Sequence, residues 1–262
     1  MELPTIREPK NKNPNVMILY SMPKAGKTTI TAQLEDSLML ELEPGGGDYV
    51  KGRIMEINNP KEWEDSLRLL ETTPGKICEH LIVDTTTKLD EWSEIVGTYR
   101  YMNKPQGKKF NREGQTESGA LIKHTDPRFE TVHELGQGFG YQHSRTVMTD
   151  WYDRLLNLIP TGKVKYIILV AHVKDKLIET RKGDIIDSID INLTGKVKSI
   201  YASRADAIGF FYRKDKQGFI NFNNEYKVVC GGRCAHLDGE ILISEKQPDG
   251  KIITFWDNIY IK

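Results

Sequence analysis

The chain has few cysteines and no long apolar run. Its three cysteines, Cys78, Cys230 and Cys234, are too few for a disulfide framework and leave no second pair to complete a zinc site. The longest apolar run, residues 166–171, is far shorter than a membrane span. The first four residues have neither the charged part nor the apolar part of an export signal. We therefore expect a cytoplasmic protein, in a reducing environment and without a membrane partner.

The chain also has no excess of charge of either sign. Lysine plus arginine and aspartate plus glutamate are balanced at 37 each, so no global field attracts nucleic acid or a membrane surface. Any binding to a polyanion must come from a local patch. The length of 262 residues suits one large α/β domain.

The strongest motif follows an apolar run over residues 16–20, which we predict to be a strand. It spells Ser-Met-Pro-Lys-Ala-Gly-Lys-Thr over residues 21–28, and a predicted helix comes next. Strand, loop and helix in this order are what a phosphate-binding loop requires, because loop amides and the helix N-terminus hold the anion. The residues expected to contact the nucleotide are Pro23, Lys24, Ala25, Gly26, Lys27, Thr28 and Thr29.

Two side chains of this motif have specific expected roles. Lys27 is expected to reach the β- and γ-phosphates of ATP, and Thr28 to bind Mg²⁺ through its hydroxyl group. Ser21 departs from the motif, which has its first glycine at that position. The alternative is a lysine-rich turn that caps a helix. The strand in front and the carboxylates downstream favour the phosphate-binding loop.

Two predicted strands further on end in carboxylates. Residues 38–43 end in Glu43 before a Pro-Gly-Gly-Gly turn, and residues 80–84 end in Asp84 before hydroxyl residues. Ligands bind beyond the carboxyl ends of parallel strands, so we expect both side chains beside Lys27. A buried aspartate needs a partner, which Mg²⁺ supplies. The alternatives are a solvated carboxylate at the glycine turn for Glu43 and a helix cap for Asp84.

A further apolar strand, over residues 164–171, ends at His172. We expect this histidine to contact the γ-phosphate and to report hydrolysis to the loop over residues 174–194. An equally supported alternative is a histidine that caps the strand by bonding to backbone. Helices are predicted over residues 59–72, 88–99, 146–159 and 195–204, and further strands over 53–57, 207–212, 219–222, 226–230, 240–244 and 252–256.

The segment over residues 100–143 has little periodicity and is long for a loop in a compact domain. Its first part, residues 100–123, has six basic and two acidic residues, a net charge of +4, and aromatic rings lie among them. Such a mixture suits single-stranded DNA, because cations follow the phosphates and rings stack on bases. A solvated loop is the alternative. The DNA-binding candidates in this segment are Lys104, Lys108, Lys109, Phe110 and Arg112.

In chain order, the phosphate-binding loop, Glu43, Asp84 and His172 each follow an apolar strand. This order resembles the RecA/RadA-type ATPase core, and most of all the short phage RecA-like proteins regarded as single-strand annealing recombinases. The Val-Ala-His strand end at residues 170–172 and the Ala-Asp-Ala-Ile segment at 205–208 add to the resemblance.

The resemblance implies an α/β fold, a RecA-like P-loop NTPase with a mostly parallel central sheet flanked by helices. Residues 1–13 are then a flexible lead-in, and residues 14–213 are the ATPase core with its long basic loop. Residues 214–262 are expected to form an antiparallel β extension of the same domain.

The resemblance also implies roles for single residues. Glu43 orients and deprotonates the attacking water, Asp84 holds the Mg²⁺ shell, and His172 senses the γ-phosphate. A second DNA-binding loop corresponds to the segment that contains Lys174 and Lys176. Members of the family assemble side by side, as rings or filaments, with ATP at the junction. The remaining candidates are Arg233 as a finger reaching into a neighbouring subunit, and Tyr49, either stacked on adenine or buried in the core.

The resemblance implies that the partners are single-stranded DNA and further copies of the chain, with a single-strand-binding protein as a candidate. It also implies a phage protein made in a bacterial host. Two other functions stay open at this point. One is a P-loop kinase of a small metabolite or nucleotide, with the long loop as a lid. The other is a non-catalytic, nucleotide-dependent scaffold of a replication complex.

Overall fold

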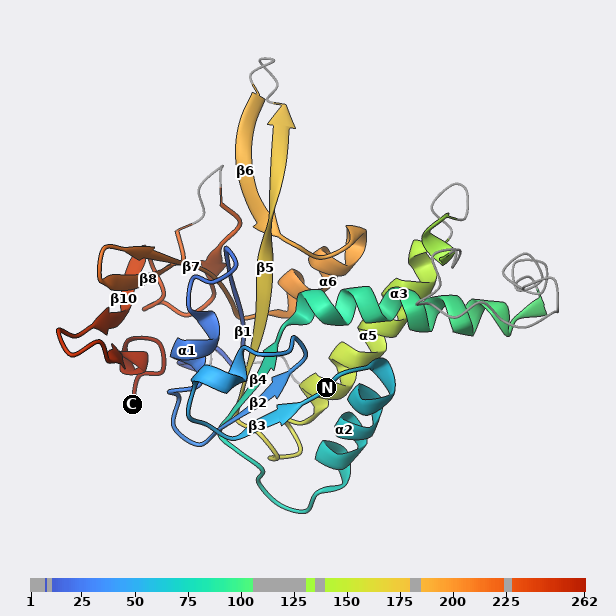
Figure 1. Ribbon diagram of the computed structural model, residues 1–262, viewed down its shortest axis with the longest axis horizontal. Helices are drawn as coiled ribbons and strands as arrows, with labels where there is room; N and C mark the ends of the chain where they lie inside the picture. The colour runs from blue at the N-terminus through green and yellow to red at the C-terminus, as the bar shows by residue number, and fades with distance from the viewer. Residues whose placement is uncertain (1–7, 9–10, 106–130, 135–139, 180–184, 224–227) are drawn as a thin grey trace, which may run out of the picture.

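The computed structural model describes residue 8 and residues 11–105, 131–134, 140–179, 185–223 and 228–262. In this part of the chain a single twisted sheet runs through the molecule, and helices pack against it (Figure 1). No helix among the described residues is both long and apolar enough to cross a membrane.

The bounds of the elements, in chain order, are as follows. The strands are β1 (Val16–Ser21), β2 (Ser37–Glu41), β3 (Ile54–Glu56), β4 (His80–Asp84), β5 (Tyr166–Glu179), β6 (Ile185–Ile191), β7 (Ala207–Lys214), β8 (Gln217–Asn221), β9 (Gly231–Gly232), β10 (Glu240–Lys246) and β11 (Ile252–Thr254). The helices are α1 (Lys27–Thr31), α2 (Pro60–Thr72), α3 (Thr86–Met102), α5 (Tyr141–Asn157) and α6 (Gly195–Arg204), with short 3-10 turns η1 (Gly47–Tyr49), η3 (Val132–Glu134) and η5 (Trp256–Asn258).

The order of strands across the sheet is β11-β10-β8-β7-β1-β5-β4-β2-β3. The strands from β7 to β3 in this order run parallel, whereas β8, β10 and β11 extend the β7 side in antiparallel fashion. The predicted α/β fold, with a mostly parallel sheet and an antiparallel C-terminal extension, is therefore confirmed. Because β5 lies between β1 and β4, the strand before the phosphate-binding loop and the strand that ends in Asp84 are not neighbours.

Strand β1 shows why the central strands have continuous apolar sequences. Val16, Ile18 and Tyr20 belong to one buried cluster, and Met17 and Leu19 belong to another on the opposite face. Successive side chains of a strand point to opposite faces, so a strand covered on both sides needs apolar residues throughout.

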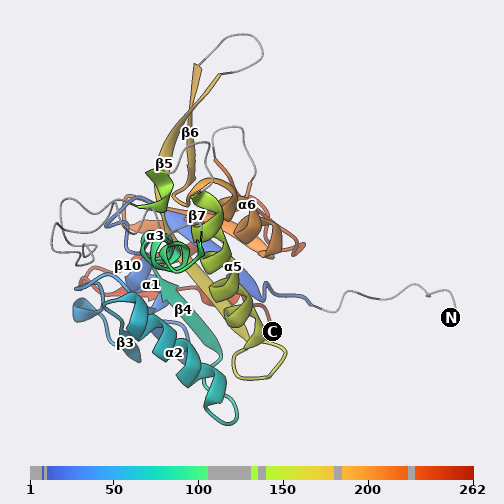
Figure 2. The ribbon, with the colours of Figure 1, turned by 90° about the vertical axis from the view of Figure 1, so that its right-hand side faces the viewer.

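Helices α2, α3, α5 and α6 cover the first face, as the two ribbon views show from perpendicular directions (Figures 1 and 2). Trp63 of α2 meets Trp151 of α5 edge to face, with 6.1 Å between ring centroids. Helix α1 and the C-terminal residues cover the second face, where the Trp256 indole N–H donates to the Ile30 carbonyl oxygen at 2.8 Å. The C-terminal region thus closes the core.

The predicted helices form at or close to the expected positions. Helix α6 has the predicted bounds, and α2 begins directly after Asn59, whose side chain accepts hydrogen bonds from the backbone N–H groups of Lys61 and Glu62. Helices α3 and α5 begin a few residues earlier than predicted.

The prediction that β5 ends at His172 and is followed by a loop over residues 174–194 was wrong. His172 is paired with Ser21 at the end of the parallel register with β1, but β5 continues to Glu179 and pairs there with β6. Beyond His172, β5 and β6 form a two-stranded ribbon, here called the arm, which projects from the sheet (Figures 1 and 2). In the arm the antiparallel register runs from Val173 opposite Ile191 to Glu179 opposite Ile185.

Candidate functional site

Strands β1, β2 and β4 end at a pocket of about 540 Å³, and β5 passes it at His172. The chain reaches it from the loop after β1, the turn after β2 and the end of β4, and from His172 on β5. The residues that line the pocket are Pro23, Lys24, Gly26, Lys27, Thr28, Thr29, Glu41, Glu43, Pro44, Gly45, Gly46, Tyr49, Asp84, Thr85 and His172. Nearly all predicted nucleotide residues therefore meet at one place; Ala25 is in the same loop but outside this lining.

The loop between β1 and α1 buries its lysine. Gly26 has φ +107°, a conformation that favours glycine, and it directly precedes α1. Lys27 is only 6% exposed, and its Nζ donates to Ser21 Oγ at 2.9 Å and to the carbonyl oxygens of Ser21 and Met22 at 3.2 and 3.3 Å. These contacts match the three donors of an ammonium group. Burial lowers the pKa of Lys27 to about 8.

Ser21, the departure from the motif, fits the loop without strain. It is the last residue of β1 and is fully buried, and its backbone is extended, so the position does not demand a glycine. Its hydroxyl donates to the Met22 carbonyl oxygen at 2.9 Å and accepts from Lys27. The serine thus helps to hold the lysine.

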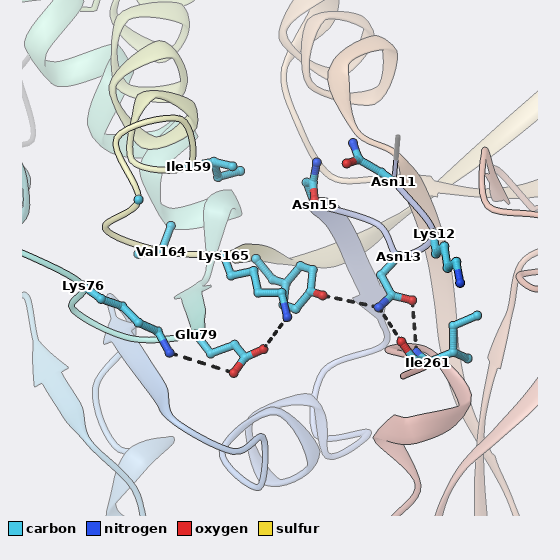
Figure 3. A pocket seen from close by; sticks show the side chains of 12 residues that line it. Asn11, Lys12, Asn13, Asn15, Lys76, Glu79, Ile159, Val164, Lys165 and Ile261 are labelled. Atoms are coloured by element: carbon cyan, nitrogen blue, oxygen red, sulfur yellow. Dashed lines mark hydrogen bonds and ion pairs between the residues drawn. The ribbon is translucent and has the colours of Figure 1, made fainter. Parts of the chain in front are cut away.

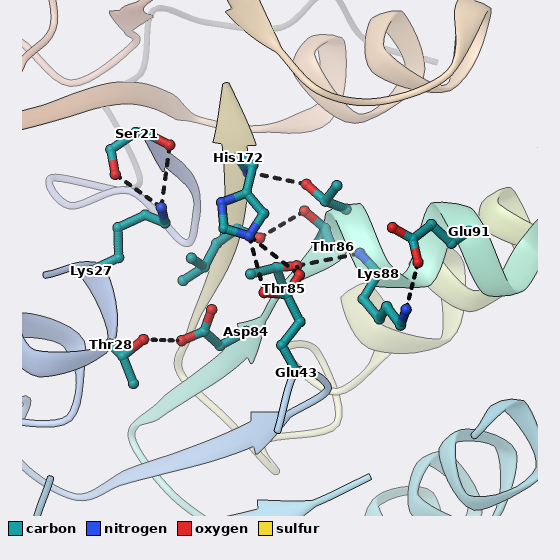
Figure 4. Close-up of polar contacts among 12 residues, drawn as sticks. Ser21, Lys27, Thr28, Glu43, Asp84, Thr85, Thr86, Lys88, Glu91 and His172 are labelled. Carbon is teal, nitrogen blue, oxygen red and sulfur yellow. Dashed lines mark hydrogen bonds and ion pairs between the residues drawn. The ribbon is translucent and has the colours of Figure 1, made fainter. Parts of the chain in front are cut away.

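Thr28 and Asp84 bring a hydroxyl and a carboxylate together. Thr28 Oγ1 donates to Asp84 Oδ2 at 2.6 Å (Figure 4). Asp84 is 6% exposed, and burial raises its pKa. A cation would relieve this burial cost, and both oxygens are ligands that Mg²⁺ accepts. Among the described residues no group of three or more His, Cys, Asp or Glu side chains forms a metal cage. A Mg²⁺ ion here therefore depends on phosphate and water oxygens for its other ligands, as Mg²⁺ commonly does.

Glu43 lies in the turn after β2 and has two side-chain partners (Figure 4). His172 Nε2 is 3.0 Å from Glu43 Oε2 and 3.2 Å from Oε1, and Thr85 Oγ1 donates to Oε1 at 2.8 Å. The hydrogen bond from His172 lowers the pKa of Glu43. The carboxyl group is therefore ionised at neutral pH and can accept a proton.

His172 joins this cluster through its backbone as well as its ring. Its backbone N–H donates to Thr87 Oγ1 at 3.0 Å, while its ring contacts the Glu43 carboxylate and no backbone group in the described part of the chain. The predicted contact with a γ-phosphate stays a prediction. The geometry adds a carboxylate partner that the sequence did not indicate.

Two residues of the site were missed by the sequence analysis, Glu41 and Thr85. Glu41 is buried at the end of β2, and its Oε1 accepts from the Gly47 backbone N–H at 2.5 Å. A Cβ atom on Gly47 would lie 2.6 Å from Glu41 Oε2, so this turn needs glycine for a close approach. The sequence feature that could have revealed Glu41 is its position two residues before Glu43. For Thr85 it is the run of hydroxyl residues that follows Asp84.

Tyr49 lies in η1 at the pocket and is 90% exposed, so the alternative of a core tyrosine was wrong. Its position leaves an aromatic face available beside the pocket. Stacking on adenine stays a prediction.

The remaining candidates that the structure describes do not line the pocket. Arg233 follows β9 and pairs with Asp206 at 3.4 Å, and Asp206 also accepts from the Val16 backbone N–H at the amino end of β1. Arg233 therefore lies at the edge of the sheet opposite the pocket. Lys104 is exposed just after α3, and Lys174 is exposed on the arm. Lys108, Lys109, Phe110, Arg112 and the side chain of Lys176 lie outside the described residues.

A larger pocket, of about 720 Å³, lies at the amino-terminal edge of the sheet (Figure 3). Its Glu79 is paired with Lys165 at 2.9 Å, and the Asn13 amide donates to the Ile261 carbonyl oxygen at 2.8 Å. This pocket has amide and ammonium groups but no phosphate-binding loop. The chemistry predicted from the sequence is therefore concentrated in the smaller pocket.

The topology and the smaller pocket define a P-loop α/β protein. The family model described as "AAA domain" matches residues 13–234, which is well over half of the chain, so the chain belongs to this family. The match begins next to the predicted start of the core at residue 14 and continues past the predicted boundary at 213.

Comparisons with whole proteins add the following. Among solved structures, the chain is similar to the one described as "Crystal structure of the RadB recombinase", with a TM-score of 0.46 and 11% sequence identity. That match covers 93% of this chain and 92% of the other. No curated protein sequence matches the chain.

Proposed function

We propose that the protein is a Mg²⁺-dependent ATPase of RecA-like type that acts on single-stranded DNA in phage-type recombination or repair, by annealing or strand pairing. The observation that supports this most is the meeting of Lys27, Thr28, Glu43, Asp84 and His172 around one pocket. A chance capping lysine or a solvated carboxylate would not bring five such groups together beside the carboxyl ends of β1, β2 and β4 and the middle of β5.

Each residue has a role that follows from its chemistry. Lys27 binds phosphate through its ammonium group once it exchanges partners within the loop. Thr28 and Asp84 would hold Mg²⁺, which neutralises phosphate charge when bound. Glu43 is ionised and accepts the proton of the attacking water. His172, which already contacts Glu43, is placed to respond to a change at that carboxylate.

The proposed DNA contacts are the basic segment that includes Lys104 and the arm that includes Lys174; the side chains of these two lysines are exposed. Residues 100–123 have a net charge of +4, whereas residues 172–191 of the arm have four basic and five acidic residues, so the arm would contribute single cations and no net positive charge. The same proposal includes assembly into rings or filaments, in which Arg233 reaches into a neighbouring subunit. It also includes a single-strand-binding protein as a partner. Residues 14–213 as core and 214–262 as its extension are proposed domain bounds.

The experiment that tests this function is ATP hydrolysis measured with and without single-stranded DNA. We expect hydrolysis that requires Mg²⁺ and is stimulated by single-stranded DNA. Phosphate transfer to a small acceptor without stimulation by DNA would favour a kinase. Nucleotide binding without any turnover would favour a scaffold. Either outcome would overturn the proposal.

Affinity for single-stranded DNA is expected to fall steeply with salt. If about four cations contact phosphates, a plot of log affinity against log salt concentration should have a slope of about −3. Fluorescence anisotropy of a labelled oligonucleotide at several salt concentrations gives this slope. A flat plot would remove the DNA-binding part of the proposal, and the ATPase part would be unaffected.

A further inference from the structure

Helix α3 begins with buried threonines that all use their hydroxyl groups. Thr85, the residue that caps the helix, donates to Glu43 Oε1 at 2.8 Å. Thr86 donates to the Val170 carbonyl oxygen at 2.9 Å, and Thr87 accepts from the His172 backbone N–H at 3.0 Å. Figure 4 shows Thr85 pointing to Glu43, while Thr86 points to β5. Only the first threonine contacts the reactive carboxylate.

Glu43 depends on such contacts for its orientation. It lies two residues beyond β2, in a turn, and its side chain is 41% exposed. A partly exposed glutamate loses rotamer freedom only where neighbours hold it, and that ordering has an entropic cost. Among the described residues, the side-chain hydrogen bonds to its carboxylate come from His172 and Thr85.

The direction of the Thr85 hydroxyl proton is itself determined. A hydroxyl group has one proton and two lone pairs. Thr85 Oγ1 accepts from the Lys88 backbone N–H at 3.3 Å as the cap of α3, so its proton is free for Glu43. Thr85 is also only 2% exposed, so water does not compete for this bond. The hydroxyl is therefore a preorganised donor aimed at the carboxylate.

We propose that Thr85 is a positioning residue for Glu43, and that its hydroxyl holds the carboxylate in the orientation that accepts the proton of water. The inference rests on the proposed function, because it takes Glu43 as the base. With one of the two donors removed, the carboxylate keeps its charge but turns more freely about its side-chain bonds. Loss of orientation at a reacting group slows the chemical step and leaves nucleotide binding in place.

The test compares three variants of the full chain. Thr85→Val removes the hydroxyl but keeps the shape, and Thr85→Ser keeps the hydroxyl. Thr86→Val is the matched control, because it deletes an equally buried hydroxyl of the same helix turn that has no contact with Glu43. For each variant we would measure kcat and KM for ATP hydrolysis, nucleotide affinity, and the thermal unfolding midpoint.

We expect Thr85→Val to lower kcat about tenfold with nucleotide affinity unchanged. Thr85→Ser and Thr86→Val should stay within about twofold of the wild type. In a Glu43→Gln background, Thr85→Val should cause no further loss, because residues that act through one another are not additive.

Two results would overturn the inference. One is unchanged kcat in Thr85→Val. The other is an equal loss in Thr85→Val and Thr86→Val, which would show that the loss comes from disturbing the start of α3 and not from the contact with Glu43. In both cases the wild type would still hydrolyse ATP, so the proposed function would stand. Absence of hydrolysis by the wild type would instead remove the proposed function and, with it, the role of Thr85.

Discussion

Replacement of Glu43 by glutamine is expected to lower ATP turnover on the order of a thousandfold and to leave nucleotide affinity unchanged. Glutamine keeps the size of the side chain and can still accept from Thr85, but it cannot take a proton from water. The substitution therefore removes the base while most of the contacts persist. Single-turnover hydrolysis and equilibrium binding of a fluorescent ATP analogue measure the two effects separately.

Glu91→Gln is the matched control for this variant. Glu91 is an exposed carboxylate on α3 that pairs with Lys88 at 2.5 Å and does not line the pocket. Its replacement should change turnover by about twofold at most. If Glu43→Gln hydrolysed ATP at the wild-type rate, the base would have to be a different residue.

Replacement of Lys27 by methionine is expected to weaken nucleotide binding about a hundredfold. Methionine fills the volume of the lysine stem but has no donors for phosphate. Because burial already lowers the pKa of Lys27 to about 8, the variant loses a desolvated charge, and the fold should tolerate the change. Isothermal titration of ATP, together with thermal unfolding, measures both effects.

Lys51→Met serves as its control, since Lys51 is exposed and does not line the pocket. It removes one positive charge from the surface and should leave nucleotide affinity within about twofold of the wild type. Equal affinities in Lys27→Met and the wild type would contradict the assignment of the loop after β1 as a phosphate-binding loop.

The fold and the center of the pocket could be predicted because their sequence signals are local. Apolar runs such as residues 16–20 report strands buried on both faces, and glycine and threonine beside Lys27 report a turn into a helix. The rule that ligands lie beyond the carboxyl ends of parallel strands then places Glu43 and Asp84 at the same edge. The structure brings these residues together as that rule requires.

The features that the sequence did not reveal depend on contacts between distant residues. The bond from Thr85 to Glu43 joins positions 42 residues apart, and that from His172 to Glu43 joins positions 129 apart. The arm was missed because Lys174 and its charged neighbours interrupt the apolar pattern of β5. Glu41 was missed because a buried carboxylate is rare, and nothing local indicates the backbone N–H that satisfies it.

The continuity of β5 has a consequence for how two ligands would influence each other. One uninterrupted strand borders the pocket at His172 and then becomes half of the arm. If a polynucleotide bound to the arm shifts β5, the shift also moves His172, which contacts Glu43. If the bound polynucleotide changes the affinity for ATP by some factor, thermodynamic linkage requires ATP to change the affinity for the polynucleotide by the same factor. The coupling energy can therefore be measured in two ways, which should agree. One is the affinity for the polynucleotide with and without bound ATP, and the other is the affinity for ATP with and without bound polynucleotide.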